Sequence, residues 1–247
     1  MLPAMRIDDW RPEALRLTAF PAEPQSGDAT GWQRVTGAEP VERTQQPRVG
    51  QSHEAGPFAR GLLRLIREPA RIEWRYEPVF TDENDDGLLG PLAEELNSWL
   101  PLMSRWLEGA PDLMRLAFGA VLAHEVPDKE EGYRLLGGML PSVKLNPGSS
   151  DFLYRINRQR PSGLDAKVLI NRLSTWTVRY VTHVGFRIVA GKPLPPEPGP
   201  RSYAVRLELD INTAAEYDGR FSKDRLVARF RELVELGKEI ADKGDVA

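Results

Sequence analysis

The chain has 247 residues, of which 41% are hydrophobic and 28% charged, with a formal net charge of -3 at pH 7. These values are typical of a folded globular protein and exclude a disordered or fibrous chain. The sequence contains no cysteine, which excludes disulfides, thiolate catalysis, iron-sulfur clusters and cysteine-based zinc sites. No apolar run has the length of a transmembrane helix, and residues 1–10 lack the apolar core of a signal peptide. We therefore expect a cytoplasmic protein.

The first half of the chain predicts three strands and a short helix. Residues 15–20 have the composition of a strand, and a short helix is expected at residues 32–36, after a connection rich in Pro, Gly and Ser. Residues 61–66 and 71–76 are rich in β-favouring apolar residues and flank the turn-prone Pro69. We expect these two segments to pair as a hairpin.

A longer helix is expected over residues 92–106, because large apolar side chains recur there at helical spacing. These are Leu92, Leu96, Trp99, Met103 and Trp106. Pro101 lies inside this segment and has no backbone N–H to donate, so it is expected to kink or split the helix. The apolar stripe is expected to face the sheet.

The second half predicts the same order of strand, helix, strands and helix. Strands are expected at residues 115–122, 151–157, 168–188 and 203–211, and a helix at 129–140, where Asp128 and Glu131 form a capping box. The last helix is expected to begin at Ser222, to stop at Gly244 and to bury a stripe of Leu226, Phe230, Leu233 and Ile240. The proline-rich stretch 191–202 is not expected to form a central strand.

Together these elements predict an α+β fold with a largely antiparallel sheet and helices packed on one face. Residues 15–20 (LRLTAF) echo residues 114–118 (MRLAF), which suggests a tandem strand-helix-strand-strand pseudo-repeat. Residues 1–110 would form an N-terminal half and residues 111–247 a C-terminal half, and we expect the two to share one core.

Four phrases of the sequence carry a resemblance: WQRVTG at 32–37, RIEW at 71–74, DFLYRIN at 151–157 and RLELDINT at 206–213. They resemble those of a sporadically distributed family of uncharacterised bacterial proteins of about this size. The similarity spans most of the chain and includes no catalytic motif. The resemblance implies a bacterial cytosolic protein with an accessory role, and it assigns no site residue.

Catalytic and metal-binding motifs are scarce in the sequence. It contains no nucleotide-binding loop, hydrolase elbow or zinc-protease helix. His53, His124 and His183 are expected on a loop, a strand end and a long strand. Pro127 follows His124 closely and breaks any helix that would carry a second zinc ligand. The sequence therefore does not favour a zinc site, and we expect no cofactor.

One acidic stretch matches the opening of a calcium-binding loop. Asp82, Asn84 and Asp86 stand at alternate positions and Gly87 follows, which is the pattern of oxygen ligands before a tight turn. The twelfth position is Ala93, where a glutamate is needed. We therefore keep these residues as a weak calcium candidate beside a simpler interpretation, an acidic turn before a helix N-terminus.

Charge is segregated along the chain. Residues 77–131 contain 13 acidic and 3 basic residues, whereas residues 144–206 contain 11 basic and 3 acidic residues. On the expected strand 168–188, aromatic and aliphatic residues share one parity, and threonines and cations share the other. One face of this strand would be core and the other basic. The expected strand 203–211 alternates in the same way, with Arg206, Glu208 and Asp210 against Val205, Leu207, Leu209 and Ile211. The candidate binding residues are Arg155, Arg158, Arg160, Arg172, Arg179, His183 and Arg187.

Four interpretations of these charges remain open. The blocks could lie against each other or form an inert solvated face. The basic residues could bind phosphate or nucleic acid, although the net charge and the absence of a known motif count against this function. Glu73, Glu208 and Asp210 could serve an enzyme as acid-base groups, although sheet-face salt bridges explain them more simply. We favour a non-catalytic protein-interaction module in a bacterial accessory system, with the charged blocks steering a protein partner.

Overall fold

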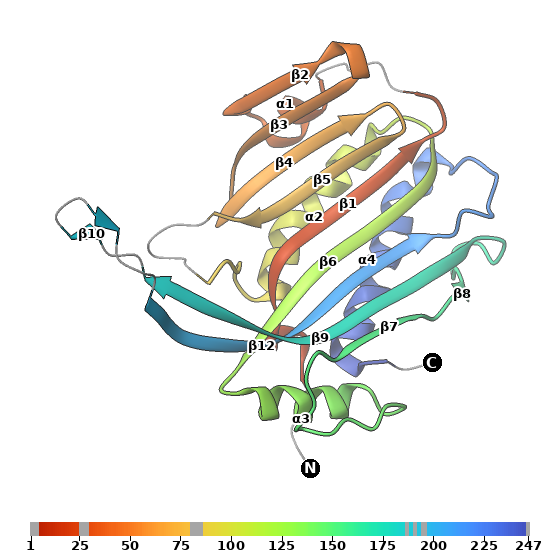
Figure 1. Cartoon of the computed structure of the whole chain (residues 1–247). Coiled ribbons are helices and arrows are strands. Elements are labelled where there is room, and N and C mark those ends of the chain that lie inside the picture. The colour runs from red at the N-terminus through yellow and green to blue at the C-terminus, as the bar shows by residue number, and fades with distance from the viewer. Residues whose placement is uncertain are drawn as a thin grey trace.

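A computed structural model describes residues 5–24, 30–79, 86–185, 188–189, 192–193 and 197–245. Within them the chain forms an open ten-stranded antiparallel sheet and four α-helices (Figure 1). The strand order is β2-β3-β4-β5-β1-β6-β12-β9-β7, and β8 pairs with β9. The predicted α+β class and the antiparallel sheet are confirmed.

The helices and strands have the following bounds. The first half contains β1 (Arg11–Pro21), α1 (Thr30–Thr36), β2 (Glu42–Gln46), β3 (Gln51–Phe58), β4 (Gly61–Glu68), β5 (Arg71–Pro78) and α2 (Leu92–Glu108). The second half contains β6 (Leu113–Val126), α3 (Lys129–Met139), β7 (Leu153–Asn157), β8 (Arg160–Pro161), β9 (Leu169–Gly185), β10 (Ile188–Val189), β11 (Lys192–Pro193), β12 (Glu197–Thr213) and α4 (Leu226–Lys243).

The two halves repeat one arrangement around the central pair β1 and β6. From β1 the sheet continues outward through β5, β4 and β3, and from β6 it continues through β12, β9 and β7. Each half thus has the order strand, helix, strands, helix, as the sequence predicts. Because α2 ends at Glu108 and β6 begins at Leu113, the halves meet near residue 110.

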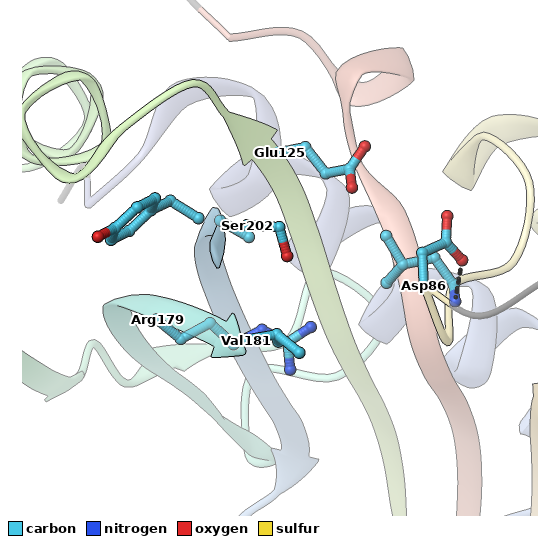
Figure 2. A pocket seen from close by; sticks show the side chains of 8 residues that line it. Asp86, Glu125, Arg179, Val181 and Ser202 are labelled. Atoms are coloured by element: carbon cyan, nitrogen blue, oxygen red, sulfur yellow. Dashed lines mark hydrogen bonds between the residues drawn. The ribbon is translucent and has the colours of Figure 1, made fainter. Parts of the chain in front are cut away.

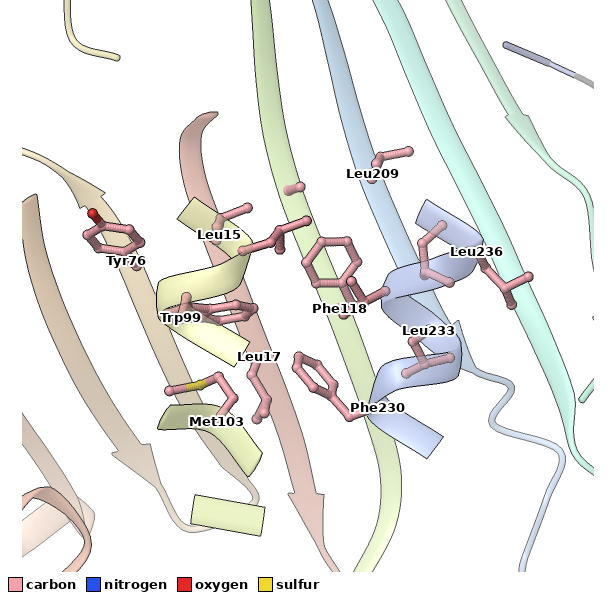
Figure 3. Packing of buried hydrophobic residues seen from close by; sticks show 14 of the residues in the cluster. Leu15, Leu17, Tyr76, Trp99, Met103, Phe118, Leu209, Phe230, Leu233 and Leu236 are labelled. Atoms are coloured by element: carbon pink, nitrogen blue, oxygen red, sulfur yellow. The ribbon is translucent and has the colours of Figure 1, made fainter. Parts of the chain in front are cut away.

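The core lies between the sheet and its helices. Figure 1 shows α2 and α4 side by side behind the sheet, with α3 below them. Trp99 of α2, Phe118 of β6 and Phe230 of α4 meet at the centre, where the Trp99 and Phe230 ring centroids are 5.8 Å apart (Figure 3). One buried cluster therefore includes residues of both halves. None of the described helices is both long enough and apolar enough to cross a membrane.

The predicted helix stripes are buried, but α2 is not split at Pro101. The helix runs unbroken from Leu92 to Glu108. Pro101 is exposed, so its ring points to solvent and water can hydrate the carbonyl group that loses a partner. In α4 the stop at Gly244 is confirmed by its φ of 76°. Ser222 starts a short 3-10 turn before α4, and its hydroxyl bonds to Asp224 without capping the helix.

The strands β2 and β3 were not expected from the sequence, nor were the two-residue strands β8 and β11. β2 and β3 form the far edge of the sheet, and His53 lies on β3, so the expectation of a loop there was wrong. Every residue of β2 is exposed and most are polar. Because β2 buries nothing, its sequence lacks the apolar pattern from which strands are recognised.

The proline-rich stretch was expected to be a loop and not a central strand; β12 already begins at Glu197, so part of the stretch is strand, but that part is not central. The last pair between β12 and β6 is Tyr203 with Val126, whereas the pairing of β12 with β9 continues to Glu197 and Gly185. The early part of β12 is therefore a free edge on one side. Among the described residues this part of β12 pairs with β9 alone, and proline is found in such edge positions and at register shifts like the one between Pro198 and Arg201. Figure 1 shows this pair of strands extending beyond the sheet as an arm.

Candidate functional site

The face of the sheet turned away from the helices is polar, and we call it the open face. The strand β12 presents Arg206, Glu208 and Asp210 there, while the alternate residues Val205, Leu207, Leu209 and Ile211 are buried. On β9, Trp176 is fully buried and Arg179 lies on the opposite parity, in register with Ala204. The predicted alternation therefore holds on β9 as far as Arg179 and on β12 from Val205 to Ile211. It ends at Tyr180, which is 62% exposed because the strand there enters the arm.

Small residues on the central strand β6 form a trough in the open face. β6 presents Ala117, Gly119, Val121 and Ala123 on this side. Charged side chains from the flanking strands therefore cross over β6. A Cβ atom on Gly119 would lie 2.9 Å from Nε of Arg16, so the arginine lies directly on the glycine backbone.

The crossing side chains join in ion pairs. Arg179 Nη2 lies 2.5 Å and Arg206 Nε 3.2 Å from the carboxylate of Glu13 on β1. In the opposite direction, Arg16 Nη2 of β1 lies 3.9 Å from Glu208 Oε1 of β12. Neighbouring halves of the molecule are thus connected across the trough by charge pairs.

A hollow of about 640 Å³ lies over this trough. Its cations are Arg64, Arg75, Arg179 and Arg206, and its carboxylates are Glu13, Glu77 and Asp86. Leu62 and Val121 are among the apolar residues that line it. A smaller hollow of about 180 Å³ adjoins it, and Figure 2 shows Arg179 and Val181 from β9, Ser202 from β12, Glu125 from β6 and Asp86 around it. The open face therefore has a binding-sized depression with mixed charge.

Of the seven predicted binding residues, five have side chains that the structure describes, and these five are divided between the two faces of the sheet. Arg155 pairs in register with Thr175, which places it on the open face with Arg179. Arg158, Arg160 and Arg172 instead contact carboxylates at the end of α4, on the helix side. The side chain of His183, on β9, and the whole of Arg187 lie outside the described residues. The described arginines of the predicted set therefore lie on both sides of the sheet and do not form one basic face.

The arginines on the helix side hold the C-terminal helix. Arg158 donates from Nε and Nη2 to Asp245 at 2.5 and 2.8 Å. The Glu239 carboxylate forms ion pairs with Arg160 Nη2 at 2.8 Å and with Arg172 Nη2 at 3.4 Å. Burial lowers the pKa of Arg172, which is 2% exposed, and the nearby Arg160 lowers it further. The hydrogen bond from Arg158 holds the pKa of Asp245 below its usual value. These contacts are those of a structural clamp.

The acidic and basic blocks do not neutralise each other. Among the described residues, no ion pair joins residues 77–131 to residues 144–206. The acidic block pairs with arginines such as Arg11, Arg60 and Arg64. The basic block pairs with Glu13 and with α4. Each block therefore finds ion-pair partners in parts of the chain that belong to neither block.

The metal candidates find little support in the part of the chain that the structure describes. Asp82 and Asn84 lie outside it, and Asp86 bonds to Arg11 Nη1 at 2.6 Å and to the backbone N–H of Leu88 at 2.9 Å. No group of three acidic or histidine side chains with metal-binding geometry occurs within the described ranges. His124 contacts the carbonyl oxygen of Asp9.

The carboxylates considered for acid-base chemistry are also engaged. Glu208 pairs with Arg206 at 3.4 Å, and Glu73 lies 3.8 Å from Arg71. Asp210 accepts a hydrogen bond from Asn212 Nδ2 at 2.9 Å. Salt bridges and hydrogen bonds on the sheet face thus account for all three.

Sequence reasoning missed the arginines of β1, β4 and β5, which come from the N-terminal half. Arg64 and Arg75 stand at equal distances from the turn at Pro69 and Ala70, so the predicted hairpin itself would have placed them opposite each other. Arg16 becomes part of the group only through the pairing of β1 with β5, and no local signal in the sequence gives that pairing. Comparison of the sequence with models of known protein families gives no match, and no curated protein is significantly similar to it.

Proposed function

We propose that the protein is a non-catalytic interaction module that binds a protein partner through the open face. The observation that carries this proposal is the trough over β6, where arginines and glutamates of both halves meet in a hollow of about 640 Å³ on a face that no described helix covers. A mixed array of fixed charges is suited to a protein surface, because complementary charges steer association and select the partner.

The mixed charge favours a protein over a nucleic acid as the partner. Nucleic-acid binding needs cations that neutralise a continuous row of phosphates. Here Glu13, Glu77 and Asp86 line the same hollow as the arginines and would repel such a row. The three helix-side arginines of the basic block are occupied at α4 and add nothing to that surface.

We further propose that the protein acts in the cytoplasm of a bacterium, in an accessory role. The absence of cysteine suits a reducing compartment, and the resemblance described above implies the same setting. This part of the proposal depends on the sequence alone.

Quantitative co-purification tests the use of the open face. Tagged wild-type protein would be compared with two single variants of the open face, Arg75→Gln and Arg206→Gln, with their double variant, and with Lys238→Gln, which removes one charge from α4, where Lys238 pairs with Glu235. Equal thermal stability of all these proteins would verify folding. We expect wild type and Lys238→Gln to recover the same protein from a lysate of the native host, and the double variant to recover several-fold less. Equal recovery by all of them, or recovery of no partner at low salt, would contradict the proposal.

A further inference from the structure

Three arginines stand side by side on adjacent strands of the open face. Arg75 of β5 is directly opposite Arg64 of β4 on one side and Arg16 of β1 on the other. We call these three residues the arginine row. Neighbouring strands lie roughly 4.8 Å apart, and like charges directly opposite each other destabilise a sheet. Two consecutive like-charge pairs therefore oppose folding, and such departures from good packing are expected at functional sites.

In the ion pairs that the arginine row makes, guanidinium groups outnumber carboxylates. Glu77 is shared by Arg64 at 2.6 Å and Arg75 at 2.7 Å. A second chain of ion pairs runs from Arg16 to Glu208, from Glu208 to Arg206, from Arg206 to Glu13 and from Glu13 to Arg179. The first chain contains two arginines and one glutamate, and the second contains three arginines and two glutamates. An arginine therefore stands at each end of both chains.

The backbone positions of the arginine row are fixed by strand pairing, and its side chains are accessible. Its side chains are between 30% and 42% exposed, so the stems lie on the sheet and the charged ends reach solvent. The backbone of three hydrogen-bonded strands fixes their spacing. A guanidinium group is planar and matches a carboxylate with two parallel hydrogen bonds. The row is thus preorganised for several carboxylates spaced along one segment.

We infer that the partner contacts the open face through an acidic segment, whose Asp or Glu side chains bind the arginine row. This inference rests on the proposed function and specifies its partner. The segment would carry neutral or apolar residues between its carboxylates, because Leu62 and Val121 line the same hollow and offer apolar contacts. Separated carboxylates also avoid Glu13 and Glu77, whereas a dense polyanion does not.

Fluorescence anisotropy with a labelled twelve-residue peptide of alternating glutamate and glycine tests this inference on the full-length protein. We expect wild type to bind this peptide and not a peptide of alternating lysine and glycine. Loss of one charge-assisted contact should weaken binding about tenfold in Arg75→Gln. Lys238→Gln should bind like wild type. Binding should weaken as salt rises from about 50 mM to about 300 mM, because exposed charges are screened.

Two results would overturn the inference. One is the absence of acidic-peptide binding by wild type, or binding that Arg75→Gln leaves unchanged. The other is tighter binding of a single-stranded oligonucleotide than of the acidic peptide. If the native partner is lost from the open-face variant and yet the acidic peptide does not bind, the acidic segment is wrong while the proposed function stands. If neither depends on the open face, both fail.

Discussion

The ion pair between Arg158 and Asp245 distinguishes a structural role from a binding role for the basic block, and Asp245→Asn tests it. The Asp245 side chain is 3% exposed and accepts hydrogen bonds from Arg158 and from the hydroxyl group of Tyr154 at 2.9 Å. Hydrogen bonds to charged groups contribute about 1.5 to 3 kcal/mol. Arg158 is one-third exposed and regains water in the variant, so we expect a loss of about 2 kcal/mol, or roughly 4 to 8 °C in Tm for a chain of this size.

The pH dependence of this loss sharpens the test. Because the folded-state pKa of Asp245 lies below its unfolded value, the carboxylate stabilises the fold fully above the unfolded pKa of about 4, and this contribution is lost as pH falls through the folded pKa. The difference in Tm between wild type and Asp245→Asn should therefore be smaller at about pH 3 than at pH 7. Arg155→Gln, on the exposed open face, should match wild type. Equal Tm values for wild type and Asp245→Asn at pH 7 would refute the clamp, and a difference that is independent of pH would refute the role of the charge.

Three further substitutions test other parts of the structure. Glu239→Gln removes the ion pair of the buried Arg172 guanidinium with Glu239 and leaves Asp245 as a nearby negative charge, so it should cost about 2 kcal/mol in urea unfolding, whereas Glu235→Gln, on an exposed part of the same helix, should cost under about 0.5 kcal/mol; equal effects would contradict this role of Glu239. Gly244→Ala should lower Tm, because Gly244 has a φ of 76° and an added Cβ would lie 2.1 Å from the carbonyl oxygen of Met139; an unchanged Tm would show that the helix end is not fixed as described. Gly119→Val should displace the flexible Arg16 side chain, so we expect reduced partner recovery at unchanged Tm, and undiminished recovery would argue against a role for the trough.

Local patterns in the sequence predicted the elements that bury apolar residues. The stripes of α2 and α4, the hairpin of β4 and β5, and the alternation on β9 and β12 all follow from side chains that contact the core. β2 has no such side chains, and its existence depends on pairing with β3. The repeat of strand, helix, strands, helix was visible in the order of elements, but the central contact between β1 and β6 was not.

The candidate site was harder to predict because it depends on register between distant segments. Arg172 and Arg179 are both arginines of β9, but they differ in parity, so one lies under α4 and the other on the open face. Glu13 reaches Arg206 across nearly 200 residues of sequence, at 3.2 Å. Charge counted along the chain therefore indicated a basic block, while the three-dimensional pairing decides which of its members are free to meet a partner.

Photo-crosslinking would show which face of the protein contacts the partner. A photoreactive amino acid would replace Leu62, which lines the hollow on the open face, or Lys238, which lies on α4, and both proteins would be irradiated in cells of the native host. We expect a covalent adduct with a protein partner from position 62 and none from position 238. An adduct formed from position 238 alone would place the binding surface on the helices and contradict the assignment of the open face.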